Sequence, residues 1–516
     1  MTAPLGPNVP VAVLGAGTMG IGIAQVAAAA GHHVLVHDVA EGAVTRAKRD
    51  LGQRLMGSVA RGSMTEDAAA GLLDRITGCD ALAEFAGCGL VVEAIVEDLE
   101  AKRATFRLLE QILAPEAILA TNTSSLSVTA IAAGLERPGR VVGMHFFNPA
   151  PVMPLVEIVS AATTDPAVAD LVHATATAWG KTAVRCASTP GFIVNRVARP
   201  FYGEALLMLQ EGMADPSTID AAVTGAGGFP MGPFTLMDLV GLDVNLAVST
   251  SVYEQTYHDA RFAPSVIQRS LVDAGRLGRK SGRGFYGYGP DDERPAPAAV
   301  GSGPVAGPVT VHGDMGWAAG LVGRLRSAGV TVDQGEVTEV AHLRYQDTVL
   351  VPTDGRTATE LGAVRTLGGA VVVLDLVRDW ETAEGVAVAA AGGAPPSALG
   401  AAAGVLGAGG LIAHPVSDRP ALVLMRIVAQ LASVAADAVM EGVAAAGDVD
   451  VAMRLGTGYP AGPLEWGDAI GSAALAAVLD RLHAYYGLER YRVAGAIRQA
   501  SLTGGPLRTI ERGHRL

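Results

Sequence analysis

The chain has 516 residues, of which 50% are hydrophobic and 17% are charged, and its formal net charge is −13. This length predicts two to four domains with buried cores, and the composition excludes an intrinsically disordered protein. The acidic balance argues against nucleic acid or an anionic membrane as a partner, because both favour a basic surface.

Cysteine usage and hydropathy indicate where the protein works. The three cysteines, Cys79, Cys88 and Cys186, are odd in number and lack metal-ligand spacing, so we expect a reducing cytoplasm and no metal site. The apolar stretch 9–30 lacks the basic start of a signal peptide, because the first Lys or Arg is Arg46. No other stretch is apolar for long enough to cross a bilayer. We therefore expect a cytoplasmic protein with no membrane partner.

A glycine loop follows the first predicted strand, 9–14, and opens a helix over 21–30. In such a loop the glycines permit a tight turn, the approach of a pyrophosphate and close helix packing, while the helix N-terminus faces the phosphates. The next strand, 33–37, ends at Asp38, which we expect to bind the adenosine ribose. The neighbouring Val39 and Ala40 offer no arginine for a 2′-phosphate, so NAD is favoured over NADP. The loop residues are Gly15, Ala16, Gly17, Thr18, Met19 and Gly20.

Residues 40–76 are predicted to form two helices joined by a turn near Arg61, with Thr65 as the cap of the second helix. Arg54 and Arg61 lie one to two helical turns apart, so they can share a face toward a phosphate. The alternative is a solvated basic helix.

Three further predicted strands each end in polar residues. The strand 90–97 ends at Glu97, with Lys102 one turn into the next helix. The strand 118–121 leads to Asn122 and Ser124, and the strand 141–144 leads to His145. Open α/β sheets bind ligands at the carboxyl ends of their strands, so these groups are expected to converge on one site.

The chemistry that this convergence fits is the oxidation of a secondary alcohol. A histidine takes the hydroxyl proton, a carboxylate such as Glu157 steadies the imidazolium, and a nicotinamide takes the hydride. Taken alone, His145 reads as a structural histidine and the Asn-Thr-Ser-Ser run as a turn or helix cap. Their order, spacing and position at strand ends together favour catalysis.

Over residues 9–288 the chain resembles the L-3-hydroxyacyl-CoA dehydrogenase family. The resemblance is carried by six motifs, at residues 15–20, 122–125, 145–157, 191–196, 229–233 and 278–286. It implies an NAD cofactor, an acyl-CoA thioester substrate and (S) stereochemistry at the hydroxyl.

The resemblance also implies residue roles. His145 is then the general base, Glu157 orients it, and Ser124 and Asn195 hold the substrate oxygens. The excursion 40–76 binds the CoA nucleotide, and Arg61 falls on a CoA-contacting position. The cofactor-contacting positions are the glycine loop, Asp38, Glu97, Lys102, Asn122 and Asn148.

The second half of the chain repeats the first. Glu211-Gly212, Pro230 and Gly232-Pro233 recur 230 residues later without a gap, which indicates a duplicated helical domain. The second copy carries Met425 where the first has Asn195, so we expect no second active site. Relatives with one such domain dimerise through it, and a tandem copy can supply that surface within one chain, so that the two copies form a pseudo-dimer. The chain is then expected to be a monomer or to form a homodimer.

A Pro, Ala and Gly-rich linker, 291–308, separates the copies. Strands are predicted at 309–311, 348–351 and 370–374, forming a small degenerate α/β domain that we expect to bind no nucleotide, and 391–412 reads as an Ala/Gly-rich connection. The predicted fold is a Rossmann-type α/β domain, an all-α domain, the degenerate α/β domain and a second all-α copy. The expected boundaries are 1–188, 189–290, 305–395 and 413–516.

The two-copy layout resembles a long bacterial subgroup typified by 3-hydroxyadipyl-CoA dehydrogenases of phenylacetate breakdown. Arg199, on the helical face of Asn195, is a candidate for binding a distal carboxylate of the acyl chain, and a structural arginine is the alternative. The expected substrates are 3-hydroxyadipyl-CoA or 3-hydroxybutyryl-CoA, in aromatic or fatty acid catabolism. Two other functions stay open: a β-hydroxyacid dehydrogenase that does not use CoA, and a catalytically silent NAD-binding protein.

Overall fold

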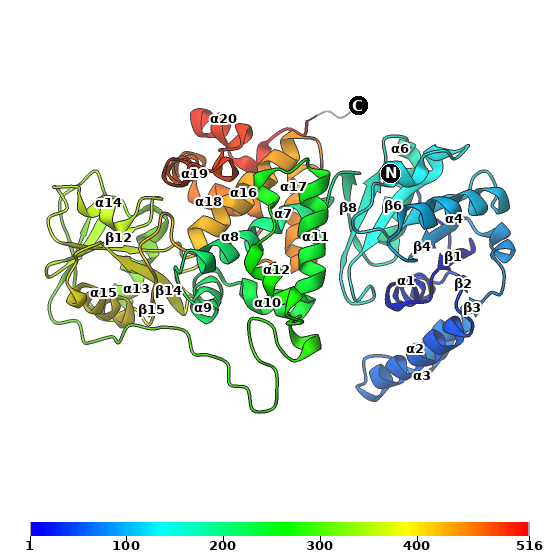
Figure 1. Ribbon diagram of the computed structural model, residues 1–516, viewed down its shortest axis with the longest axis horizontal. Helices are drawn as coiled ribbons and strands as arrows, with labels where there is room; N and C mark the ends of the chain where they lie inside the picture. Colours follow the sequence, from blue (N-terminus) through cyan, green and yellow to red (C-terminus); the bar gives the residue numbers. More distant parts are fainter. Residues whose placement is uncertain (1, 514–516) are drawn as a thin grey trace. The chain divides into compact units, whose positions relative to one another are not determined.

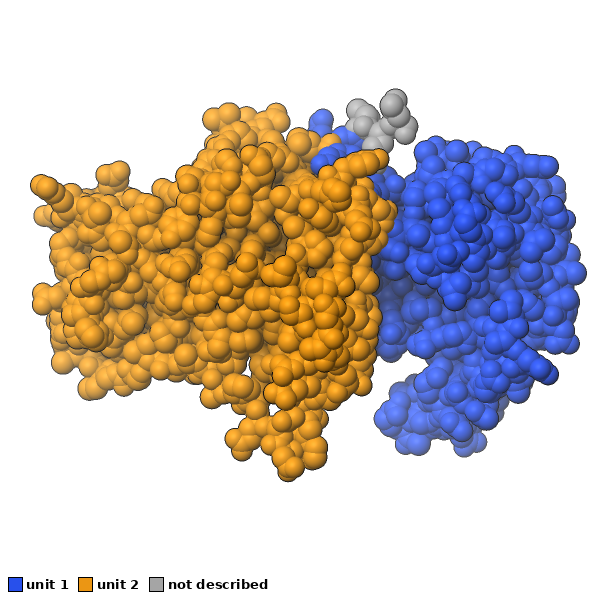
Figure 2. Space-filling view, viewed as in Figure 1, with its two compact units in different colours: residues 1–196, 441–457, 511–516 blue, residues 197–440, 458–510 orange. Residues whose placement is uncertain are grey.

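The computed structural model describes residues 2–513 and divides them into two compact units (Figure 2). Unit 1 holds the described residues of 1–196, 441–457 and 511–516. Unit 2 holds residues 197–440 and 458–510. Each unit therefore contains residues from the duplicated second half of the chain.

Unit 1 is built on an eight-stranded sheet with the order β3-β2-β1-β4-β5-β6-β7-β8 (Figure 1). The strands from β3 to β6 are parallel, β7 is antiparallel to β6, and β8 is parallel to β7. This arrangement confirms the predicted Rossmann-type domain. The strands are β1 (Val11–Leu14), β2 (Val34–His37), β3 (Ile76–Gly78), β4 (Leu90–Glu93), β5 (Ile118–Thr121), β6 (Val141–Phe146), β7 (Leu155–Ser160) and β8 (Thr182–Ala187).

The apolar runs of these strands explain the layers. β1, β4 and β5 are buried along their whole length, as expected of parallel strands with helices on both faces. The predicted helical excursion is present as α2 and α3, and the Thr65 side chain accepts a hydrogen bond from the Ala68 amide, which confirms it as the cap. The helices are α1 (Thr18–Ala29), α2 (Ala43–Ala60), α3 (Glu66–Asp74), α4 (Leu99–Ile112), α5 (Val128–Ala132) and α6 (Pro166–Ala178), with short 3-10 turns η1 (Leu82–Gly87) and η2 (Pro138–Arg140).

The two helical copies have their helices in the same order, with α7 and α8 of the first copy corresponding to the single helix α16 of the second. α10 begins at Pro233 and α18 at Pro463, each after a glycine cap, so the offset of 230 residues holds in the structure. α8 and α16 pack against each other within unit 2. The first copy contains α7 (Val194–Val197), α8 (Arg199–Gln210), α9 (Pro216–Gly227), α10 (Pro233–Val240), α11 (Leu242–Gln255), η3 (Ala260–Phe262), α12 (Val266–Asp273) and η4 (Arg279–Ser281). The second contains α16 (Leu424–Met440), α17 (Ala446–Thr457), α18 (Pro463–Ile470), α19 (Ser472–Tyr486), η6 (Glu489–Tyr491), α20 (Gly495–Thr503) and η7 (Leu507–Thr509).

The second sheet, in unit 2, is larger than the sequence predicted. It has seven strands where three were expected, and the stretch 391–412, expected as a connection, forms α15 and leads into β15. Alanine has high helix propensity, and the Ala-rich α15 buries Ala402 and Leu406, which explains the difference. The order is β10 (Val332–Gln334), β9 (Val309–His312), β11 (His342–Tyr345), β12 (Thr348–Pro352), β13 (Ala370–Leu374), β14 (Gly385–Ala390) and β15 (Ile412–Pro415). Its helices are η5 (Gly316–Ala318), α13 (Ala319–Ser327), α14 (Ala358–Gly362) and α15 (Pro396–Ala408).

Each sheet is packed by a helix of the helical copy that is remote from it in sequence. In unit 1, α17 packs on β7 and β8, and the Ala187 amide donates to the Val443 carbonyl over 2.8 Å. In unit 2, α9 packs on β14 and β15, and the Ser417 amide donates to the Met213 carbonyl over 2.9 Å. These two hydrogen bonds join residues at equivalent positions, because both partners are shifted by 230.

Membrane-spanning helices were also sought among the described residues. No single helix there is both long and apolar enough to cross a membrane. α10 and α11 satisfy length and composition only when taken as a pair, and that pair is bent by 100°.

Candidate active site

The glycine loop joins β1 to α1 in a form that only glycine permits at two positions. Gly15 has φ of +103°, and a Cβ there would lie 2.5 Å from the Ala94 carbonyl oxygen. A Cβ at Gly20 would lie 1.8 Å from the carbonyl oxygen of Gly15. Gly17 instead borders open space, so its backbone is accessible to a ligand at the start of α1. The loop therefore has the shape that a pyrophosphate requires.

Asp38 is tied to this loop by its side chain. One carboxylate oxygen accepts from the Ala16 amide over 2.7 Å, and the other accepts from the Ala40 amide over 2.8 Å. Val39, directly after it, is 96% exposed and offers no positive charge. A fixed carboxylate here suits a ribose hydroxyl and repels a 2′-phosphate.

A cavity of about 880 Å³ extends from the loop to the helical excursion. Gly17, Thr18, Asp38 and Asn148 line it, and so do Arg54 and Arg61. Sequence reasoning missed a third arginine of the same wall, Arg46. Its spacing from Arg54, close to two helical turns, was the signal that would have revealed it.

His145 and Glu157 form the centre of a second cluster. They are directly opposed in the antiparallel pairing of β6 and β7, and both side chains are buried. The His145 Nδ1 lies 2.6 Å from a Glu157 oxygen, which leaves Nε2 as the nitrogen for a substrate. The ring centroids of Phe147 and Phe192 lie 4.6 and 5.7 Å from the centroid of the imidazole, so both rings pack against it. This pair has the arrangement of a general base and its orienting carboxylate.

Glu157 also anchors the start of α7. Its other oxygen accepts from the Ile193 and Val194 amides, each over 3.0 Å. The next residue is Asn195, whose Nδ2 donates to the Ser124 carbonyl over 3.3 Å. One carboxylate therefore positions both the base and the helix that carries Asn195.

Glu97 accepts hydrogen bonds from three residues of the Asn-Thr-Ser-Ser run, 122–125. Its carboxylate accepts from the Thr123 hydroxyl over 2.6 Å, from the Ser124 amide over 3.0 Å and from the amide and hydroxyl of Ser125. Burial raises the pKa of Glu97, but these bonds and the charge of Lys102 outweigh it and lower that pKa overall. Glu97 is thus an anion that orders the loop beside the base.

Lys102 lies behind this loop rather than on an open surface. Its amine is 1% exposed and lies 2.5 Å from Glu93 and 3.3 Å from Glu97. Sequence reasoning missed Glu93, which is fully buried in β4. A carboxylate in an otherwise apolar strand was the available signal, because such groups are buried only when paired. Asn122 accepts from the Phe146 amide over 2.8 Å and so links this loop to the strand of His145.

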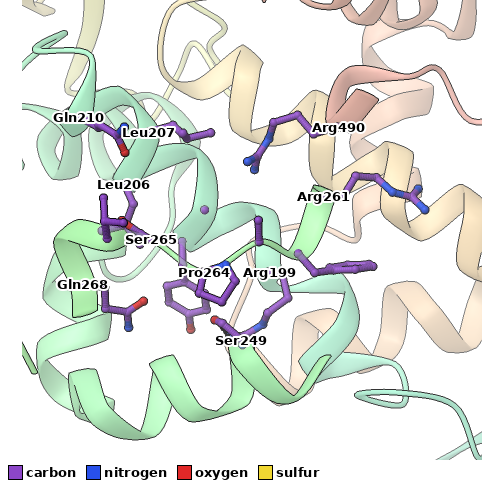
Figure 3. A pocket seen from close by; sticks show the side chains of 15 residues that line it. Arg199, Leu206, Leu207, Gln210, Ser249, Arg261, Pro264, Ser265, Gln268 and Arg490 are labelled. Carbon is purple, nitrogen blue, oxygen red and sulfur yellow. Dashed lines mark hydrogen bonds between the residues drawn. The ribbon is translucent and has the colours of Figure 1, made fainter. Parts of the chain in front are cut away.

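Arg199 lies in unit 2, at the start of α8. Its side chain is 7% exposed and donates to the Ser249 hydroxyl over 3.1 Å. It lines a separate cavity of about 200 Å³ (Figure 3).

The chain matches three family descriptions in succession. Residues 10–189 match "3-hydroxyacyl-CoA dehydrogenase, NAD binding domain", and residues 191–288 and 422–507 both match the C-terminal domain of that family. Residues 350–420 match "3-hydroxybutyryl-CoA dehydrogenase reduced Rossmann-fold domain". The double match of the C-terminal domain agrees with the duplication.

Similar proteins cover either the whole chain or its first half. A 3-hydroxyadipyl-CoA dehydrogenase of Escherichia coli is 43% identical over 95% of this chain and 97% of its own length. A probable 3-hydroxybutyryl-CoA dehydrogenase of Deinococcus radiodurans is 45% identical over 54% of this chain and 99% of its own. A crystal structure of a 3-hydroxybutyryl-CoA dehydrogenase from Escherichia coli K12 superposes with a TM-score of 0.88 at 41% identity, covering 96% of this chain and 99% of the other.

Proposed function

The chain belongs to the 3-hydroxyacyl-CoA dehydrogenase family and oxidises 3-hydroxyacyl-CoA to 3-oxoacyl-CoA with NAD, and on this premise we propose which of its residues carry the reaction. NAD, when bound, accepts the hydride from C3 of the substrate. The glycine loop and Asp38 hold it, and Glu97, Asn122 and Asn148 complete its site.

His145 acts as the general base. Its Nε2 takes the proton of the 3-hydroxyl, and in the reverse direction it returns that proton to the 3-oxo oxygen. Glu157 is a positioning residue, because its bond to Nδ1 selects the tautomer that presents a free Nε2. The single observation that carries this proposal is the buried 2.6 Å contact between His145 and Glu157.

Ser124 and Asn195 hold the substrate oxygens. A hydroxyl and an amide N–H can both donate to the 3-oxo oxygen as negative charge develops on it during reduction. The hydrogen bond from Asn195 to the Ser124 backbone supports this pairing, since it places both residues beside one another. Lys102 supports the site indirectly, through Glu97.

The helical excursion receives the CoA nucleotide. Arg54 and Arg61 supply positive charge on one wall of the large cavity, and Arg46 adds a third cation. Guanidinium groups bind phosphate oxygens in a bidentate manner, which suits the phosphates of CoA.

The acyl chain of the substrate carries a distal carboxylate, as in 3-hydroxyadipyl-CoA. The near full-length identity to a protein of that name supports this choice. The similar crystal structure bears a 3-hydroxybutyryl-CoA name, so the shorter substrate is the comparison to make.

The two helical copies form an intrachain pseudo-dimer, and the enzyme works in the cytoplasm. The equivalent contacts that α17 and α9 make with their respective sheets support the first statement. Along the sequence we assign the domains 1–188, 189–290, 305–395 and 413–516, although residues 441–457 of the last one pack in unit 1, and we propose that the second α/β domain binds no nucleotide.

The test is NADH consumption with acetoacetyl-CoA and with 3-oxoadipyl-CoA, using the wild type and His145→Gln. We expect turnover in the wild type, its loss in the variant with NADH binding retained, and a higher kcat/KM for 3-oxoadipyl-CoA. Equal turnover by the variant would refute the role of His145. A higher wild-type kcat/KM for acetoacetyl-CoA would refute the proposal that the acyl chain of the substrate carries a distal carboxylate.

A further inference from the structure

The loop 147–154 joins the two strands that carry the proposed base and its orienting carboxylate. It leaves β6 after Phe146 and enters β7 at Leu155. The conformation of this loop sets one wall of the large cavity beside the glycine loop, where NAD is proposed to bind. The residues of the loop that line this cavity are Asn148, Pro149, Ala150, Pro151 and Val152.

Lys181 holds this loop from the side of β8. It lies directly before β8 in the chain and is 8% exposed. Its Nζ donates to the carbonyl oxygen of Ala150 over 2.6 Å and to that of Met153 over 2.8 Å. Lys181 forms no salt bridge with any residue that the structure describes, so its partners are these two carbonyls.

An ammonium group without a carboxylate partner is costly to bury. Burial lowers the pKa of Lys181, and no charged group of the described chain opposes this effect. Hydrogen bonds from a charged donor are stronger than those from a neutral one, so the two carbonyls compensate part of the cost. We refer to Lys181 Nζ and the carbonyls of Ala150 and Met153 together as the carbonyl clamp.

The second copy holds its equivalent loop, 377–384, with a different cation. The positions 230 residues after Ala150 and Met153 are Trp380 and Ala383. Their carbonyls accept hydrogen bonds from Nη1 of Arg324, in α13, over 2.6 and 2.9 Å. The same two carbonyls of the loop therefore bind a cation in both copies.

The position of Lys181 is apolar in the second copy. The residue there is Leu411, which is 3% exposed. A leucine side chain cannot donate to the carbonyls, so another element has to supply the cation. The loop thus requires a cation in each copy, but the fold does not determine which position supplies it.

The position of Arg324 is apolar in the first copy in turn. A glycine of each helix faces the loop, because a Cβ at Gly22 of α1 or at Gly320 of α13 would lie within 3.3 Å of a side-chain atom of its loop. Four residues after these glycines stand Val26 and Arg324. α1 carries no charged residue, and it borders the cavity. With the cation on Lys181, the helix next to the cofactor site stays neutral.

We propose that Lys181 is a positioning residue for the cofactor: the carbonyl clamp fixes the loop 147–154 and thereby holds Asn148 against NAD. This inference rests on the proposed function, in which Asn148 completes the NAD site. Asn148 is exposed and lines the cavity, whereas Ala150, two residues later, is buried at the clamp. A displacement at the clamp is therefore passed to Asn148 across a single intervening residue, and small displacements of a positioning group weaken its contacts.

The test is NADH binding to the full chain, followed by fluorescence titration. Lys181→Met should raise the Kd for NADH about tenfold, because both hydrogen bonds of the clamp are lost. Lys181→Arg keeps a charged donor and should recover part of this loss. Arg324→Met is the matched control, because it removes the equivalent bonds in the second copy, and its Kd should stay within about twofold of wild type.

Kinetics and stability separate positioning from folding. Lys181→Met and Arg324→Met should both lower the Tm, which also shows whether each variant folds. Only Lys181→Met should raise the KM for NADH, with kcat within about threefold of wild type, because the pairing of β6 and β7 still holds the base. If Lys181→Met does not fold, Lys181→Gln, which keeps a neutral donor, replaces it in every measurement. A wild-type Kd in the folded Lys181 variant, or an equal rise in Arg324→Met, overturns the proposal.

Asn148→Ala distinguishes this inference from the proposed function. It should raise the Kd for NADH without lowering the Tm. If Asn148→Ala weakens NADH binding and Lys181→Met does not, the proposed function stands and the role of Lys181 is refuted. If Lys181→Met weakens binding and Asn148→Ala does not, the contact of Asn148 with NAD is refuted, and the clamp acts through the other residues of the cavity wall.

Discussion

Glu157 and Asp375 cap the same helix start in the two copies of the repeat. Glu157 accepts from the amides of Ile193 and Val194 while it holds His145. Asp375 lies 230 residues after His145 and accepts hydrogen bonds from the amides of Val423, Leu424 and Met425. Val423 and Leu424 are the equivalents of Ile193 and Val194, whose amides Glu157 binds. In the second copy a carboxylate has thus replaced the histidine and taken over the capping role, so the structural function persists without the base.

Glu157→Gln should lower kcat by roughly 10²- to 10⁴-fold, because an amide cannot orient the imidazole as a carboxylate does. Steady-state kinetics with acetoacetyl-CoA measures this effect. Asp375→Asn is the matched control in the second copy, and its kcat should stay within about twofold of wild type. Similar losses in both variants would show that the loss in Glu157→Gln reflects folding.

The stability of the protein should depend on Asp375 between about pH 4 and pH 6. Burial raises the pKa of Asp375 to about 6, despite the amides that bond to it, whereas an unfolded aspartate titrates near 4. A raised folded pKa means that the protonated side chain stabilises the fold at low pH and that this contribution is lost as pH rises through 6.

Urea unfolding of wild type and Asp375→Asn at pH 4.5 and pH 7 tests this dependence. The difference in unfolding free energy, wild type minus variant, should fall by roughly 2 kcal/mol from the lower to the higher pH. A difference that rises with pH would contradict the assigned direction.

Asn195→Ala should lower kcat/KM for 3-oxoacyl-CoA by roughly tenfold to a thousandfold, because a donor to the substrate oxygen is lost. Met425→Ala changes the equivalent residue of the second copy and should leave kcat/KM unaffected while it reduces stability. Stopped-flow or steady-state NADH oxidation separates the two. Equal losses of activity would mean that both copies contribute to catalysis.

Cofactor preference should depend on Asp38 and Val39. Replacing them with serine and arginine removes the charge that repels a 2′-phosphate and adds one that attracts it. We expect the ratio of kcat/KM for NADP to that for NAD to rise by about tenfold or more. Asp38→Ser alone separates lost repulsion from weakening of the loop, because Asp38 also bonds the Ala16 amide.

Ala421→Gly should stabilise the protein, against the usual trend for this substitution. Ala421 has φ of +62°, and the equivalent residue of the first copy is Gly191, with φ of +73°. An alanine in this left-handed region costs about 1 kcal/mol relative to glycine. Denaturant unfolding should show a gain of that order, and a loss would mean that the Ala421 methyl group contributes more through packing.

The sequence predicted the first sheet well and the second poorly, for physical reasons. Strands such as β1 and β4 are buried on both faces and therefore read as continuous apolar runs. β10 is three residues long and polar, and the alanines of β14 are equally typical of helices, so neither produced a strand pattern.

Most residues of the candidate site were named from the sequence, but the contacts between them were not. His145 and Glu157 were identified from their motif, but their opposition depends on the antiparallel register of β6 and β7, which no local pattern contains. The burial of Lys102 between Glu93 and Glu97 likewise follows from tertiary packing. Arg199 was noticed for its helical face, whereas the cavity around it is formed by residues up to Arg490.

The repeated packing of α17 on one sheet and α9 on the other has a consequence for how the protein can change. In an assembly of two identical chains, every substitution occurs twice, so one half cannot lose its chemistry while the other keeps it. Here the halves are encoded separately, and Met425 can differ from Asn195 at no cost to the first copy. The second half of the chain thereby supports the structure of the first, through the packing of α17 on β7 and β8. Its interior can change as long as these contact surfaces are kept.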